Sequence, residues 1–240
     1  MRWTRAWLLT LAAWGSAFAQ TVPQTAPVTQ PVPAPAQPTQ VTKPSFVVVI
    51  DAAHGGTDSG ARLSNGVAEK NVTLGLSVRL RSTLQARGVT VVTTRESDAA
   101  VPTLNRAEAA NHARAAACLV MHATATGSGV HLYTSALAPA GPARPMPWQT
   151  AQAQFVTQSL KLQSEIDSAL AHTQIPVTLG RASVQPMDNL TCPAVAVEIA
   201  PLVAGHITAG KDVSDAAYQK SVADALAAAV ESWRSDWKQQ

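Results

Sequence analysis

The sequence is poor in charge, and it lacks the basic clusters, long apolar runs and repeats that mark several protein classes. Only 14% of its 240 residues are charged, with 18 Lys and Arg against 15 Asp and Glu. We find no clustered Lys and Arg face of the kind that binds nucleic acid, and no internal repeat. No segment after the N-terminal end approaches the ~20 apolar residues of a membrane span. These absences argue against a nucleic-acid partner and against a membrane span in the mature chain.

A phosphate-binding loop is also missing, although glycines cluster after the first apolar run. Gly55, Gly56 and Gly60 are not followed by the Gly-Lys-Ser/Thr ending of a P-loop, and they do not keep the dinucleotide-binding spacing. Their simpler role is to let the backbone turn sharply beside His54.

The N-terminal end is typical of an export signal. Arg2 and Arg5 precede a short apolar stretch, and Ala17-Phe18-Ala19 fits the small-x-small rule for signal peptidase. We therefore expect residues 1–19 to be a cleaved signal peptide and the mature protein to reach the periplasm, the cell wall or the outside. An uncleaved anchor is the alternative, but the stretch is too short to span a bilayer. Cleavage would remove two positive charges and lower the formal net charge from +3 to +1.

Two further regions follow the signal. Residues 20–44 are rich in Pro, Gln, Thr, Val and Ala and nearly uncharged, which predicts a disordered, extended tether. Residues 45–240 have the length of one sizeable domain with a single core. No cysteine follows the apolar stretch, which argues against a lipoprotein. The two cysteines, Cys118 and Cys192, either form a disulfide in an oxidising compartment or are small buried core residues.

Apolar runs alternate with helical patterns along this domain. We predict strands at 46–51, 89–94, 118–122, 129–134 and 194–199, and helices at 71–87, 103–116, 150–172 and 214–233. Such alternation predicts a single-domain α/β fold with a mostly parallel, twisted sheet and helices on both faces.

Four polar residues fall at the carboxyl ends of these strands or at the start of the first helix. His54 follows the first strand, His122 ends the third, and Glu69 leads into the first helix. Glu198 lies near the end of an apolar strand, where a carboxylate is costly unless it is paired or functional. Ligand sites of parallel sheets lie at this edge. Two imidazoles, one carboxylate and an open position make the usual catalytic zinc arrangement, with a further carboxylate free to carry protons.

Several segments, in order, resemble the zinc-dependent N-acetylmuramoyl-L-alanine amidases (amidase type 3) over about residues 46–233. They are Val49 to Ala61 with its His-Gly-Gly turn, Asn65 to Asn71, Val92 to Asp98, Leu104 to Asn111, Val120 to Ala123 and Pro193 to Ile199. The resemblance implies that His54, Glu69 and His122 bind Zn²⁺ and that Glu198 is the general base that activates zinc-bound water. It implies that Arg95 and Arg106 are structural.

The same resemblance implies that peptidoglycan is the substrate and that the amide between N-acetylmuramic acid and L-alanine is cleaved. The sequence departs from the family at Ala52-Ala53, where Pro-Gly is usual, at Thr124, where Asn is usual, and at Ala200-Pro201-Leu202. Two alternatives therefore stay open: a non-catalytic or regulatory peptidoglycan-binding domain of the same fold, and a zinc peptidase. The sequence does not indicate whether an activator protein binds.

We predict no functional role for the other histidines, His112, His131, His172 and His206, which lie outside these motifs. Arg181 is predicted either to touch the peptide stem or to be a solvated surface residue.

Overall fold

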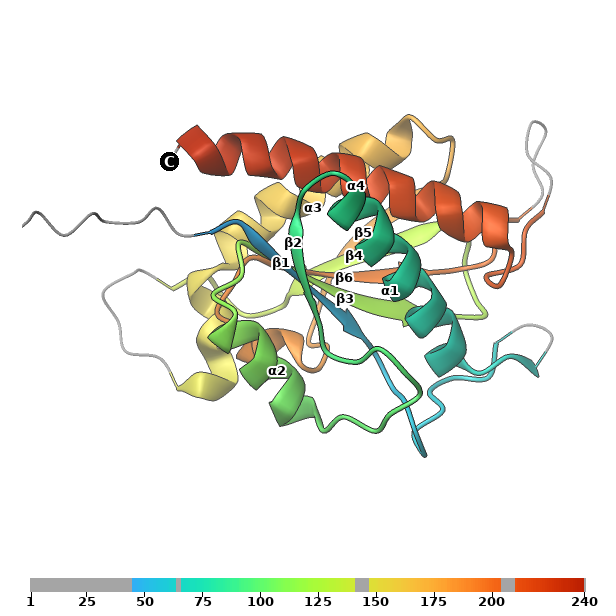
Figure 1. Cartoon of the computed structure of the whole chain (residues 1–240), viewed down its shortest axis with the longest axis horizontal. Coiled ribbons are helices and arrows are strands. Elements are labelled where there is room, and N and C mark those ends of the chain that lie inside the picture. Colours follow the sequence, from blue (N-terminus) through green and yellow to red (C-terminus); the bar gives the residue numbers. More distant parts are fainter. Residues whose placement is uncertain (1–44, 64–65, 141–146, 204–209, 240) are drawn as a thin grey trace, which may run out of the picture. The chain divides into compact units, whose positions relative to one another are not determined.

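The computed structural model describes residues 45–63, 66–140, 147–203 and 210–239 (Figure 1). The predicted signal peptide at 1–19 and the predicted linker at 20–44 lie outside the described residues. The described residues belong to one compact unit, Pro44–Gln240.

A six-stranded sheet with the order β2-β1-β3-β6-β4-β5 forms the centre of this unit. Its strands are β1 (Val47–Ala52), β2 (Thr90–Thr93), β3 (Ala117–Ala123), β4 (Val130–Ser135), β5 (Val177–Ala182) and β6 (Ala194–Ile199). Every pair of neighbouring strands is parallel except β4 and β6, which are antiparallel. The prediction of a mostly parallel sheet is therefore confirmed.

Helices cover both faces of the sheet, as predicted. One face carries α1 (Glu69–Ala86), α3 (Val156–Ala171) and α4 (Ala216–Gln239), and the other carries α2 (Thr103–His112) and the short 3-10 helix η3 (Met187–Asn189) (Figure 1). The alternation of side chains along a strand produces this division. Val48 and Ile50 of β1 belong to the core cluster that packs under α1, α3 and α4. Val49 belongs to the other cluster, which includes Ala107 and Ala110 of α2.

The predicted elements differ from the observed ones mainly at their ends. The helix expected at 150–172 is divided into a 3-10 helix, η2 (Trp148–Gln154), and α3. The helix expected at 103–116 stops at His112 because the backbone turns at Arg114, which has a φ of 47°. Strand β5 was not predicted. It lies at the sheet edge, and its half-exposed sequence includes Gly180 and Arg181, so it lacks a buried strand's apolar pattern.

Cys118 and Cys192 form a disulfide, which decides between the two alternatives for these residues. Their Cα atoms lie 6.1 Å apart. Cys118 is in β3 and Cys192 lies two residues before β6, its parallel neighbour, so the bond ties the strand of His122 to the segment that leads into the strand of Glu198.

Reduction of this disulfide is expected to destabilise the domain by about 2–4 kcal/mol, because the intact disulfide closes a long loop and so lowers the entropy of the unfolded chain. The two cysteines are 74 residues apart. Urea unfolding with and without dithiothreitol measures the difference. A double Cys118→Ala, Cys192→Ala variant, insensitive to the reductant, is the matched control. An unchanged urea midpoint in the wild type would contradict this prediction.

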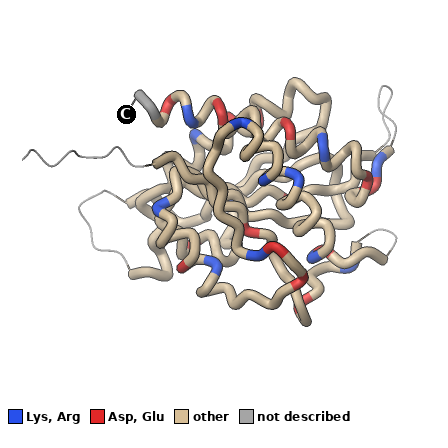
Figure 2. Tube along the Cα trace, in the orientation of Figure 1, with Lys and Arg blue, Asp and Glu red and all other residues tan. Residues whose placement is uncertain are grey.

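Charged residues are dispersed over the described domain. Lys and Arg positions are interspersed with Asp and Glu positions along the trace (Figure 2). Among the helices that the structure describes, none is both long and apolar enough for a membrane crossing.

Candidate metal centre and cleft

Three predicted ligands meet at the carboxyl edge of the sheet. His54 lies two residues after the end of β1, Glu69 is the first residue of α1, and His122 is the second-to-last residue of β3. One ligand atom from each residue lies within 4.8 Å of the other two. The two imidazole rings are nearly perpendicular, with centroids 5.6 Å apart. Residues 68 positions apart in sequence thus form one cluster.

Glu69 lies between the two histidines and uses both carboxylate oxygens. Its Oε1 is 2.9 Å from Nδ1 of His122, and its Oε2 is 3.1 Å from Nε2 of His54. The backbone amides of Ala61 and Ala123 donate to the same two oxygens. Burial alone raises the pKa of Glu69, but the hydrogen bonds from His122, His54 and these amides outweigh it and hold the pKa well below its usual range. The carboxylate is therefore ionised, as a metal ligand must be.

His54 is held by a carboxylate on each side of its ring. Nδ1 lies 2.8 Å from Oδ2 of Asp58, while Nε2 faces Glu69. The hydrogen bond to Glu69, with a smaller contribution from Asp58 and against the effect of burial, raises the pKa of His54 to about 8. The two carboxylates therefore favour a positive charge on the imidazole ring. An Nδ1–H donor to Asp58 leaves Nε2 as the ligand atom, which is the usual way a carboxylate orients a metal-binding histidine.

Two buried arginines fix the backbone that carries His54. Arg106 donates to the carbonyl oxygens of His54 and Ala52, both at 2.6 Å, and Arg95 donates to those of Ala52 and Ala53 at 2.8 and 3.1 Å. His54 has a φ of 63°, an uncommon value for a residue other than glycine. These contacts support the predicted structural role of Arg95 and Arg106. They also show that Ala52-Ala53 presents its carbonyl groups to the arginines.

Three observations indicate that this cluster suits a divalent cation. Its donor set is two imidazoles and one carboxylate, which zinc prefers. Nε2 of His122 is buried and has no hydrogen-bond partner among the described residues, so the ring has an unused ligand atom. Gly60 leaves the space clear, because a Cβ there would come within 2.6 Å of Cδ2 of His54 and 2.7 Å of Oε2 of Glu69.

Glu198 lies beside this cluster in the sheet. It pairs in parallel register with His122 on β3, and residues in register project from the same face of a sheet. His122, Glu198 and Tyr133 line one cavity of about 300 Å³. The Glu198 side chain is 28% exposed, so it remains open to water.

A second cavity of about 370 Å³ adjoins the first. His54 and Asp58 line it, together with residues near the start of α2 and the segment 183–186. His122 and Val184 line both cavities. The cluster of His54, Glu69 and His122 and the Glu198 carboxylate are therefore reached from adjoining hollows on the α2 face.

His131, for which the sequence predicted no functional role, lies beside Glu198 in the structure. It lies opposite Glu198 on the antiparallel strand β4, and its Nδ1 is 2.8 Å from Oε2 of Glu198. The only sequence signal is its alternation with buried Val130 and Leu132, which puts a polar group on the other face of the strand. The register that pairs β4 with β6 cannot be read from that pattern.

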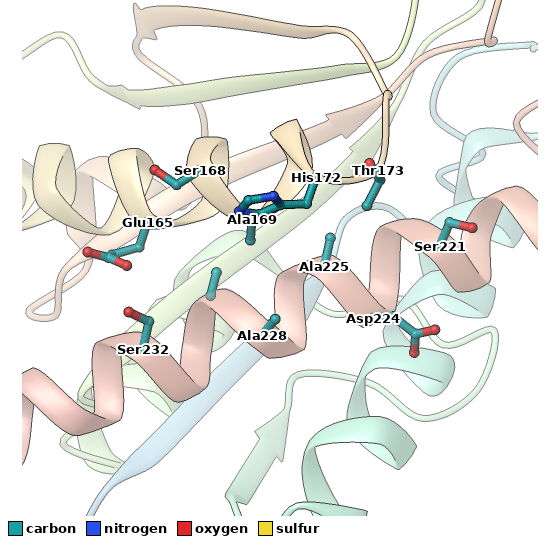
Figure 3. Close-up of a pocket in the computed structure, with 11 residues that line it drawn as sticks. Glu165, Ser168, Ala169, His172, Thr173, Ser221, Asp224, Ala225, Ala228 and Ser232 are labelled. Carbon is teal, nitrogen blue, oxygen red and sulfur yellow. The ribbon is translucent and has the colours of Figure 1, made fainter. Parts of the chain in front are cut away.

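Of the other residues considered from the sequence, Arg181, His112 and His172 are described, and none of them belongs to the cluster. Arg181 donates to the carbonyl oxygens of Ser135 and Leu137, so it secures the end of β4. His112 lines a hollow beside α2, and His206 lies outside the described residues. His172 lines a groove of about 670 Å³ between α3 and α4, whose side chains Figure 3 shows, and this groove contains none of the four predicted site residues.

The remaining departures from the family pattern tie the end of β6 to its neighbours. Thr124 donates its amide to the Ile199 carbonyl at 3.0 Å. Gly129 bonds through its carbonyl to the Ala200 amide at 2.8 Å and through its amide to the Pro201 carbonyl at 3.1 Å. These positions shape the loop between β3 and β4 rather than contribute ligands.

Comparison of the sequence with known proteins finds one matching family and several similar proteins. Residues 48–232 match the family described as N-acetylmuramoyl-L-alanine amidase. The chain is 41% identical over 86 residues to an endolysin of Bacillus phage SPP1, and 39% identical over 77 residues to the N-acetylmuramoyl-L-alanine amidase AmiA of Escherichia coli. These stretches cover 35% and 32% of this chain and only 31% and 27% of the relatives.

The fold has counterparts among solved structures. The N-acetylmuramoyl-L-alanine amidase AmiC2 of Nostoc punctiforme superposes with a TM-score of 0.61 at 22% identity, over 79% of this chain and 97% of that one. At this identity the likeness concerns the fold, and it covers the described domain almost completely.

Proposed function

The chain belongs to the N-acetylmuramoyl-L-alanine amidase family, and from this membership we propose that it hydrolyses the amide between the lactyl group of N-acetylmuramic acid and the first L-alanine of the peptide stem. Water is added across the carbon–nitrogen bond, which gives a lactyl carboxylate on the glycan and a free amine on the alanine. The observation that carries the proposal is the convergence of His54, Glu69, His122 and Glu198 at one edge of a sheet of the family's fold.

We propose that His54, Glu69 and His122 hold a zinc ion. Such an ion, when bound, polarises a carbonyl oxygen and lowers the pKa of water. The protein's own contribution is positional. Asp58 selects the tautomer of His54, the two arginines hold its backbone, and the amides of Ala61 and Ala123 keep Glu69 in place.

Glu198 is proposed as the general base. It is beside His122 in register, lines the same cavity and is accessible to water, so its carboxylate can take a proton from the attacking water and return it to the leaving amine. It is not among the three clustered ligand residues, which leaves it free for this role. A positioned base of this kind contributes about 10²–10⁴-fold to the rate.

The proposed place of action is the cell wall outside the cytoplasm. The support is the sequence pattern of residues 1–19 and the tether-like composition of 20–44, together with a polymeric substrate found outside the cell membrane. Residues 20–44 would let the domain reach the wall from its point of attachment or secretion.

Digestion of purified sacculi tests the activity. With zinc present, the protein is expected to release stem peptides that begin with a free alanine amine and to leave unsubstituted glycan, both identified by mass spectrometry. Cleavage within the peptide would instead support a zinc peptidase. Binding to sacculi without any release, by protein shown to contain zinc, would support a non-catalytic binding domain.

A further inference from the structure

We propose that His131 is a positioning residue for Glu198: it holds one carboxylate oxygen so that the other is presented to water in the cleft. This inference rests on the proposed function, because it assigns a partner to the proposed general base. It concerns a residue that lies outside every sequence motif of the family resemblance.

The first support is the contact itself. Nδ1 of His131 is 2.8 Å from Oε2 of Glu198, a hydrogen bond of normal length. An ionised carboxylate only accepts, so Nδ1 must carry the proton and donate it. Within the described part of the chain, no hydrogen bond engages the second oxygen of Glu198, which therefore stays available for a proton from water.

The second support is the rigidity of both backbones. His131 and Glu198 are direct partners in the antiparallel ladder of β4 and β6, and Glu198 and His122 are partners in the parallel ladder of β6 and β3. The three side chains thus form a row across three adjacent strands, on one face of the sheet. A donor on such a strand keeps its distance to the carboxylate better than one on a loop does.

The third support is the confinement of the imidazole ring. A Cβ at Gly127 would lie 2.4 Å from Cε1 and 2.6 Å from Nε2 of His131, so only glycine leaves room for the ring in this position. The Tyr133 ring also meets it edge-on, at a centroid distance of 6.5 Å. The His131 side chain is 13% exposed. The ring therefore cannot swing freely away from Glu198.

The expected consequence follows from the geometry of proton transfer. Glu198 has several rotatable bonds, and without its donor the carboxylate samples orientations in which neither oxygen faces the attacking water. A misplacement of about 1 Å can cost 10²-fold in rate. We expect His131→Ala to lower kcat about 10–100-fold with KM little changed, because the metal cluster and the cleft walls stay intact.

His131→Asn provides the conservative rescue. The amide nitrogen of asparagine reaches about the position of the histidine Nδ1 and donates a hydrogen bond, so this variant should recover most of the lost kcat. His172→Ala, just after the end of α3 and away from the cleft, is the matched control and should retain wild-type activity. Zinc content, measured by mass spectrometry, should be the same in all variants.

A mutant cycle separates this inference from the proposed function. Adding His131→Ala to Glu198→Ala should cost nothing further, because the histidine acts only through the carboxylate. If Glu198→Ala is inactive and His131→Ala is fully active, the positioning role is wrong and the proposed base stands. If Glu198→Ala is fully active, the proposed base fails and the inference fails with it. Equal losses in His131→Ala and His131→Asn would overturn the donor role.

Spectroscopy gives a readout that does not depend on turnover. In the wild-type protein the ¹⁵N signals of His131 should show the Nδ1-protonated ring, and Glu198→Gln should shift them. An Nε2-protonated tautomer in the wild type would contradict the proposal.

Discussion

Replacement of Glu198 by alanine is expected to reduce the release of stem peptides by about 10²–10⁴-fold, the usual contribution of a positioned general base. The loss should appear in kcat, since no ligand of the proposed metal is removed. Digestion of sacculi followed by mass analysis measures it. Zinc content and thermal unfolding temperature should stay close to the wild-type values, because Glu198 is partly exposed and its strand is otherwise buried.

Glu108→Ala is the matched control for this variant. Glu108 is an exposed glutamate on α2, and it belongs to neither of the two cavities that His122 lines. Its variant should digest sacculi at the wild-type rate. Equal activity of Glu198→Ala and the wild type would contradict the proposed mechanism and favour a binding domain with contaminating activity.

Replacement of His122 by alanine is expected to abolish tight zinc binding, because it removes one of three ligands and the partner of Oε1 of Glu69. Zinc at about 100 times its dissociation constant stabilises a protein by about 2.7 kcal/mol. For a domain of this size that corresponds to roughly 5–10 °C in Tm. The wild type should show this shift when zinc is added after chelation, and the variant should not.

The control for this prediction is again His172→Ala, which keeps the cluster and should show the full shift with zinc. Magnesium provides a second control, since it prefers oxygen ligands in octahedral geometry and should not stabilise either protein comparably. A zinc-dependent shift of the same size in His122→Ala would show that the metal binds elsewhere.

The alternating pattern of the sequence was sufficient for most of the fold. The strands β1, β3 and β6 are apolar except for one ionisable residue near the end of each, and such nearly continuous runs are characteristic of parallel strands buried on both faces. Strand β5 was missed because an edge strand has one side exposed, so its sequence need not be apolar. The end of α2 was misplaced because Ala115 and Ala116 favour a helix locally but are buried on the way into β3.

The position of the four site residues was predictable for a related reason. Parallel strands end at the same edge, so polar residues placed after β1, at the end of β3 and near the end of β6 must gather there. The pairing of Cys118 with Cys192 could not be predicted, because it depends on β3 and β6 being neighbours although 74 residues separate the two cysteines.

The sequence by itself determined the α/β class, the edge of the sheet at which His54, Glu69, His122 and Glu198 lie, and the family to which the chain belongs. These features follow from patterns of hydrophobicity and from motifs, both of which involve residues that are close together in the sequence. Only the tertiary structure decided which side chains touch. It put the Glu69 carboxylate between two imidazoles, placed Arg95 and Arg106 on the carbonyl groups around His54, and set His131 against Glu198. Such contacts depend on strand order and register, which arise from the packing of the whole domain.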